Sequence, residues 1–90
     1  MVARRFVVSG RVQGVGFRWF TMNQAAAEGI AGFVRNLPTG EVEVAAEGEA
    51  EAMARFERAI RQGPPRARVD EVVTDILAPT GRHIGFTARQ

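Results

Sequence analysis

The chain has 90 residues, with 12 basic and 10 acidic side chains and a formal net charge of +2. This length suits one domain spanning residues 1–90, and the hydrophobic fraction of 46% is ordinary for a packed core. The absence of cysteine excludes disulfides and thiolate metal sites and is compatible with a reducing compartment. No apolar run approaches the roughly 20 residues of a membrane span, and no signal peptide is recognisable, so we expect a cytoplasmic protein with no membrane partner.

The number and distribution of the basic side chains indicate whether the chain binds nucleic acid or a small anion. All 12 are arginines, which stay protonated far above neutral pH. The high sequence pI near 11.0 therefore reflects a net charge of only +2. The arginines are also dispersed among the acids. A weakly positive surface of this kind suits a small anionic substrate at least as well as a nucleic acid.

The first third of the chain predicts a strand followed by a helix. Residues 4–13 alternate between apolar and polar positions, with Phe6, Val8 and Val12 on one side. Helix-forming residues follow over 17–28, and Gly29 is well placed to end the helix. Trp19, Met22 and Ala26 share a stripe of this helix, but three consecutive alanines leave its buried face undetermined.

A hairpin is predicted next. Residues 30–36 read as a strand, 37–40 as a tight turn, and 41–47 as a strand with apolar residues inward. Its outward positions carry Glu41, Glu43 and Glu47, which we expect on a solvated face.

The remaining third predicts a second helix and two strands. Residues 49–62 form an amphipathic helix with Met53, Phe56 and Ile60 on its core face and Glu51–Arg55 and Glu57–Arg61 at i,i+4 spacing. A strand over 67–77 slips in phase near residues 72–73, which indicates a bulge there. Residues 84–88 suggest a short edge strand.

This order of elements predicts the fold class. Strand, helix, strand, strand, helix and strand around a central hairpin give an α+β ferredoxin-like sandwich, βαββαβ, with a short additional C-terminal strand. We expect both helices on one face of an antiparallel sheet.

A glycine-rich turn joins the first strand to the first helix. Several backbone N–H groups can point at one anion there. The predicted phosphate-binding backbone comprises Gln13, Gly14, Val15, Gly16, Phe17 and Arg18. The turn matches neither the nucleotide P-loop nor the dinucleotide fingerprint, because it lacks the following Lys-Ser/Thr pair and the third glycine. Arg18 could grip the same anion with its planar guanidinium.

Few other catalytic groups are present. The single histidine, His83, reads as a solvated loop residue, and no cluster of ligands indicates a metal site. This favours a substrate with a good leaving group. An acyl phosphate releases a carboxylate with a pKa near 4, so neither a proton donor nor a metal is needed. Asn36 can orient an attacking water through its amide.

Two motifs support this interpretation. The string GRVQGVGFR over residues 10–18 resembles the signature of the acylphosphatase family, and GFVRNLPTG over 32–40 resembles its second signature. The resemblance covers nearly the whole chain. It implies a ferredoxin-like fold, a phosphate-binding role for Arg18, a water-positioning role for Asn36, and acyl-phosphate hydrolysis without metal or cofactor. We expect a monomer that binds no nucleic acid.

Two other functions stay open at this point. A similar domain opens large carbamoyltransferases of hydrogenase maturation, which makes carbamoyl-phosphate handling an alternative. A non-catalytic ligand- or RNA-binding module is the other, although the strand faces lack the aromatics that would stack on bases. Trp19 and Phe20 could line the mouth of the site and favour apolar acyl groups, but core packing is the preferred reading.

Overall fold

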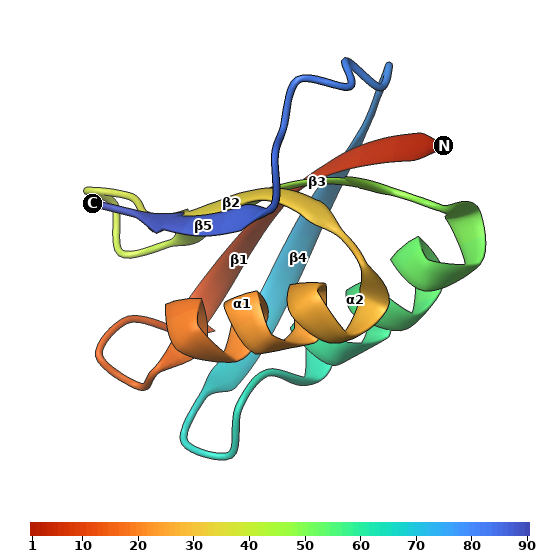
Figure 1. Cartoon of the computed structure of the whole chain (residues 1–90). Helices are drawn as coiled ribbons and strands as arrows, with labels where there is room; N and C mark the ends of the chain where they lie inside the picture. The colour runs from red at the N-terminus through yellow and green to blue at the C-terminus, as the bar shows by residue number, and fades with distance from the viewer.

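The computed structural model describes residues 1–90 and contains two helices and five strands (Figure 1). In chain order they are β1 (Val2–Arg11), α1 (Phe17–Glu28), β2 (Ala31–Asn36), β3 (Val42–Gly48), α2 (Ala50–Gln62), β4 (Arg68–Leu77) and β5 (Phe86–Arg89). The strands form one sheet in the order β4-β1-β3-β2-β5. Both helices lie on the same face of this sheet (Figure 1). The predicted α+β ferredoxin-like sandwich is thereby confirmed.

The sheet is mixed rather than wholly antiparallel. Strands β1 to β4 pair antiparallel, as predicted, but β5 pairs parallel with β2. The reason is the long connection from β4, which crosses the open face of the sheet to the far edge (Figure 1). After this crossing the chain runs opposite to β4, which is the direction of β2, so β5 and β2 are parallel. This crossing brings the C-terminal residues beside the end of β2.

A bulge is present, but not at residues 72–73. The register between β1 and β4 shifts between Ser9 and Gly10, which face Glu71 and Val69, so Asp70 is the extra residue. The backbones approach closely here: a Cβ at Gly10 would lie 2.2 Å from the Arg68 carbonyl oxygen. The bulge that shifts the phase of β4 therefore lies at Asp70, two residues before the predicted position.

The core confirms most of the predicted inward positions. Phe6, Val8 and Val12 are buried, as are Met53, Phe56 and Ile60 of α2. The buried face of α1, which the sequence pattern left undetermined, consists of Phe17, Thr21 and Ala25 at i,i+4 spacing. The Thr21 hydroxyl donates a hydrogen bond to the Phe17 carbonyl at 2.8 Å, which makes its burial acceptable.

One of the two predicted ion pairs within α2 forms. Arg61 bonds Glu57 at 2.9 Å, whereas Arg55 turns to Glu28 of α1 at 2.8 Å instead of to Glu51. The Arg55–Glu28 pair therefore links α2 to α1. Neither helix is long and apolar enough to cross a membrane.

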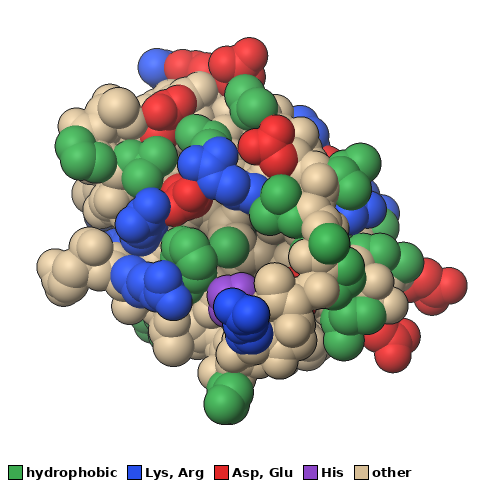
Figure 2. Space-filling view, turned by 90° about the horizontal axis from the view of Figure 1, so that it is seen from above, with side chains coloured by type: hydrophobic (Ala, Val, Ile, Leu, Met, Phe, Trp, Pro, Cys, Tyr) green, Lys and Arg blue, Asp and Glu red, His purple; other side chains and the backbone are tan.

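The glutamates of β3 are not solvated, contrary to expectation. Glu43 and Glu47 point to the open face but are only 5% and 7% exposed. Burial alone would raise the pKa of Glu43, but hydrogen bonds from the Arg5 and Arg35 guanidinium groups outweigh it and lower the pKa. Figure 2 shows this face, with blue arginine side chains gathered on one side of it.

His83 also differs from its predicted place in a solvated loop. It is half-buried, with Nε2 3.4 Å from Glu47 and its ring 6.2 Å from the Phe33 ring between centroids. Glu47 also accepts hydrogen bonds from the backbone of Thr80 and Gly81, which lower its pKa. This carboxylate therefore anchors the connection that leads to β5.

Candidate active site

The loop between β1 and α1 is shaped by two glycines in the left-handed region. Gly14 has a φ of 74° and Gly16 a φ of 79°. These angles are costly for residues with a Cβ. A Cβ added at either glycine would meet no atom within 4 Å, so the space beside the loop is open. The glycines are needed for backbone direction and leave room for a ligand.

The start of α1 leaves backbone donors available. Gly16 occupies the N-cap position, contributes no side-chain cap, and is followed by no acidic residue in the first turn. The N–H of Phe20 donates to the Gly16 carbonyl at 3.0 Å and closes the first turn. The N–H groups before Phe20 are the unpaired donors of a helix N-terminus. Together with the helix dipole, they form a site suited to an anion.

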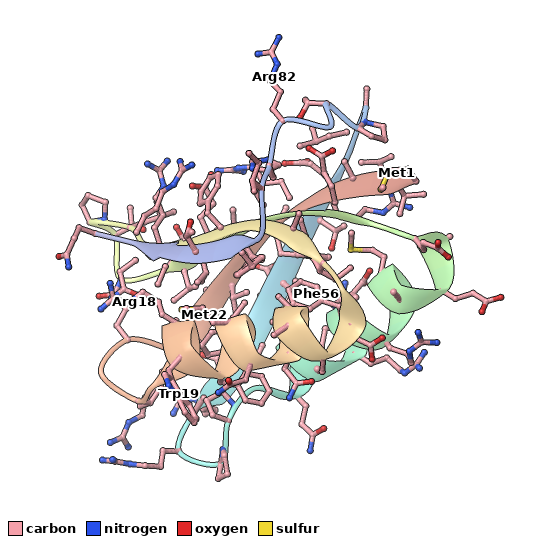
Figure 3. All side chains as sticks on the ribbon, viewed as in Figure 1. Met1, Arg18, Trp19, Met22, Phe56 and Arg82 are labelled. Atoms are coloured by element: carbon pink, nitrogen blue, oxygen red, sulfur yellow. The ribbon has the colours of Figure 1, made fainter.

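Arg18 lies on this first turn and reaches toward β5 (Figure 3). Its Nη1 donates to the Arg89 carbonyl at 3.1 Å, and it takes part in no salt bridge. A guanidinium has five N–H donors, so most of them remain for a ligand. The C-terminal strand therefore holds the arginine in place without neutralising it.

Asn36 is the last residue of β2 and pairs with Val42 of β3. It is half-buried, and its side chain makes no hydrogen bond within the protein. A free amide offers both an acceptor and donors to a water molecule.

Gln13 has a side-chain contact that sequence reasoning missed. Its amide donates to the carbonyls of Leu37 and Glu41, at 2.8 and 2.9 Å. These two carbonyls flank the hairpin turn directly after Asn36. Gln13 thus ties the glycine loop to the turn that carries Asn36. No local signal could have revealed this contact, because its partners lie 24 and 28 residues away.

The loop, α1, β2 and β5 enclose a pocket of about 380 Å³. It is lined by Val12, Gly14, Gly16, Phe17, Arg18, Trp19, Met22, Asn36, Ala88 and Gln90. The structure therefore brings Arg18 and Asn36 together beside both glycines. Gln13 and Val15 are not in the lining, and the Val15 side chain is buried in the core. Ala88 and Gln90 were not predicted to contribute, since nothing in the sequence placed β5 at this edge.

Fold and pocket define a small ferredoxin-like domain whose pocket is suited to an anion. The acylphosphatase family model matches residues 4–88. An acylphosphatase of Anaeromyxobacter dehalogenans (strain 2CP-C) is 48% identical over 88 residues, covering 98% of this chain and 95% of the relative. The chain therefore belongs to the acylphosphatase family, as the two motifs predicted.

Solved structures agree with this assignment. The crystal structure of acylphosphatase from Bacillus subtilis has a TM-score of 0.96 and 36% identity, with both chains covered completely. The crystal structure of T. kodakarensis HypF has a TM-score of 0.86 and 32% identity, covering 100% of this chain but 12% of HypF. The same fold therefore also occurs as a small part of a much larger protein.

Proposed function

We propose that this chain is an acylphosphatase that hydrolyses acyl phosphates to a carboxylate and inorganic phosphate, acting as a single domain without a metal ion. The observation that carries the proposal is the meeting of three features in one pocket. These are the uncapped start of α1, the unneutralised guanidinium of Arg18 and the free amide of Asn36.

The phosphoryl group binds at the glycine loop. Backbone N–H groups from Gln13 to Arg18 surround its equatorial oxygens, and Arg18 adds charge-assisted hydrogen bonds. Negative charge on these oxygens is stabilised by fixed dipoles and a permanent cation, which need no reorganisation during the reaction. Since β5 already holds Arg18 through the Arg89 carbonyl, little side-chain freedom is lost on binding.

Asn36 positions the attacking water. Its carbonyl oxygen accepts a hydrogen bond from the water, which directs an oxygen lone pair at phosphorus. An amide is a weak base, so the proton passes to an oxygen of the substrate's own phosphoryl group. The leaving carboxylate has a pKa near 4 and departs without protonation.

The side chains of the pocket fit this scheme. Arg18 is the one charged side chain in the lining, and the other nine lining residues have no ionisable side chain. General acid–base catalysis by a side chain would require such a group within hydrogen-bond reach. Positioning and electrostatic stabilisation therefore supply the rate enhancement.

The alternatives have less support. The chain is 48% identical to the A. dehalogenans acylphosphatase and 32% identical to T. kodakarensis HypF. A nucleic-acid module would need free aromatic faces on the open sheet. Phe33 is the aromatic residue of the strands that faces this side, and the Arg89 guanidinium lies 3.9 Å from its ring centroid. We propose a cytoplasmic monomer that binds no nucleic acid.

The test is release of inorganic phosphate from benzoyl phosphate by the purified chain in excess EDTA. We expect turnover that chelation does not diminish. Activity that EDTA removes and Mg²⁺ restores would contradict the metal-free mechanism. A chain that hydrolyses neither benzoyl phosphate nor acetyl phosphate would contradict the function.

A further inference from the structure

Trp19 stands out among the aromatic residues because it is 73% exposed. The other strongly exposed large hydrophobic residues are not aromatic, so Trp19 is the one strongly exposed aromatic side chain. Core packing was the preferred expectation for Trp19 and Phe20, and it is wrong for Trp19. Phe20 does pack inward, edge-on to Phe17 with ring centroids 6.1 Å apart. Trp19 instead contributes to the lining of the phosphate pocket.

The side chains of Trp19 and its neighbour Arg18 point to different sides of α1 (Figure 3). Consecutive residues of a helix are about 100° apart around its axis. Arg18 and Met22 face the sheet and β5, whereas Trp19 lies on the other side of the first turn (Figure 3). The pocket therefore has a polar side formed by Arg18, Asn36 and Gln90, and an indole at its opposite rim.

The in-line geometry of phosphoryl transfer relates the polar side of the pocket to the indole. In phosphoryl transfer the attacking and leaving oxygens lie roughly in line through phosphorus. If Asn36 holds the water at the end of β2, the acyl group leaves on the side away from the sheet. That side is the start of α1, where Trp19 is the strongly exposed apolar side chain of the pocket lining.

We infer that Trp19 contacts the acyl group and makes this enzyme favour acyl phosphates with an aromatic or bulky apolar acyl part over small ones. The inference rests on the proposed function. An aromatic ring in the substrate can stack on the indole or meet it edge-on. A methyl group offers too little surface to gain from the same contact.

The experiment compares kcat/KM for benzoyl phosphate and acetyl phosphate in the parent chain and in Trp19→Ala. We expect the ratio of the two values to fall by about two- to tenfold, because the gain from an aromatic pair is lost for benzoyl phosphate alone. Trp19→Phe should keep most of the preference. Ile84→Ala is the matched control, since Ile84 is 95% exposed and lies outside the pocket lining.

Two results would overturn the inference. In the first, Trp19→Ala leaves the ratio unchanged, whether both rates fall together or neither does. In the second, Met22→Ala lowers the ratio more than Trp19→Ala does, which would direct the acyl group along α1 toward β5. Failure of the proposed function would look different, because the parent chain would then hydrolyse neither compound.

Discussion

The two helices lie under the same sheet but begin differently. α2 has Glu49 at its N-cap, Glu51 in its first turn and Arg61 in its last, so its charges complement its own dipole. α1 has Gly16 at its N-cap, with no acidic residue in its first turn and no basic residue in its last. The positive end of α1 is thus left to a ligand from outside the helix, whereas the same end of α2 is partly satisfied by the chain itself.

The helices also differ in what they bury. α2 turns Met53, Phe56 and Ile60 into the core, where they pack as an apolar stripe. α1 buries Phe17, Thr21 and Ala25 and keeps Arg18 and Trp19 at the pocket. α2 is therefore a packing element, whereas α1 packs and also lines the pocket where we propose that the ligand binds. Changes at the start of α1 should affect activity, and changes at the start of α2 should affect stability.

The largest effect is expected from Arg18→Ala. Removing the one charged side chain of the pocket should lower kcat/KM for benzoyl phosphate by about 10³-fold or more. Inorganic phosphate should also become a much weaker competitive inhibitor. Thermal unfolding should change little, because the guanidinium makes a single hydrogen bond, to the Arg89 carbonyl. Activity within tenfold of the parent would contradict the role of Arg18.

Asn36→Ala separates water positioning from phosphate binding. Loss of the amide should lower kcat by about 10²-fold or more, since the water loses its orientation. The inhibition constant of inorganic phosphate should stay within about threefold of the parent value. Steady-state kinetics with phosphate as inhibitor measures both. If phosphate inhibition were lost together with the rate, Asn36 would instead belong to the phosphate-binding group.

Gly16→Asp makes α1 resemble a self-capped helix. The aspartate can accept hydrogen bonds from the first N–H groups of α1, where the phosphoryl group is expected. It also places a negative charge beside that group, so we expect kcat/KM to fall by about 10²-fold. Asparagine tolerates the left-handed region equally well and carries no charge, so Gly16→Asn is the matched control and should lose less. Equal losses in both variants would show that backbone strain is responsible.

Glu51→Gln tests the other helix and should have the smallest effect. Removing the acid from the first turn of α2 should lower the free energy of unfolding by about 0.3–1 kcal/mol, and by less in high salt. Urea denaturation at two salt concentrations measures this. The kcat/KM should not change, since Glu51 lies outside the pocket. A loss of activity without a loss of stability would contradict the division between the helices.

The interior of the sheet was largely predictable from the sequence. Phe6 and Val8 stand two residues apart, and this period of two appears in the buried face of β1. α2 was predictable for the same reason, at a period near 3.6. The pattern failed where the burial of a charged residue depends on distant partners. Glu43 is buried because Arg5 and Arg35 from neighbouring strands cover it.

The sequence by itself determined the glycine loop, the start of α1 and the alternation of the strands, because backbone preference and side-chain period are properties of adjacent residues. It also placed Arg18 in the first turn of α1, at the N-terminal end of the helix where the dipole favours an anion. The tertiary structure alone decided that Gln13 holds the turn after Asn36, that β5 lies beside β2, and that the Arg89 carbonyl meets Arg18, 71 residues away in the chain. It likewise decided that Trp19 is exposed at the pocket. Such contacts arise when packed layers bring remote segments together, and no local pattern specifies them.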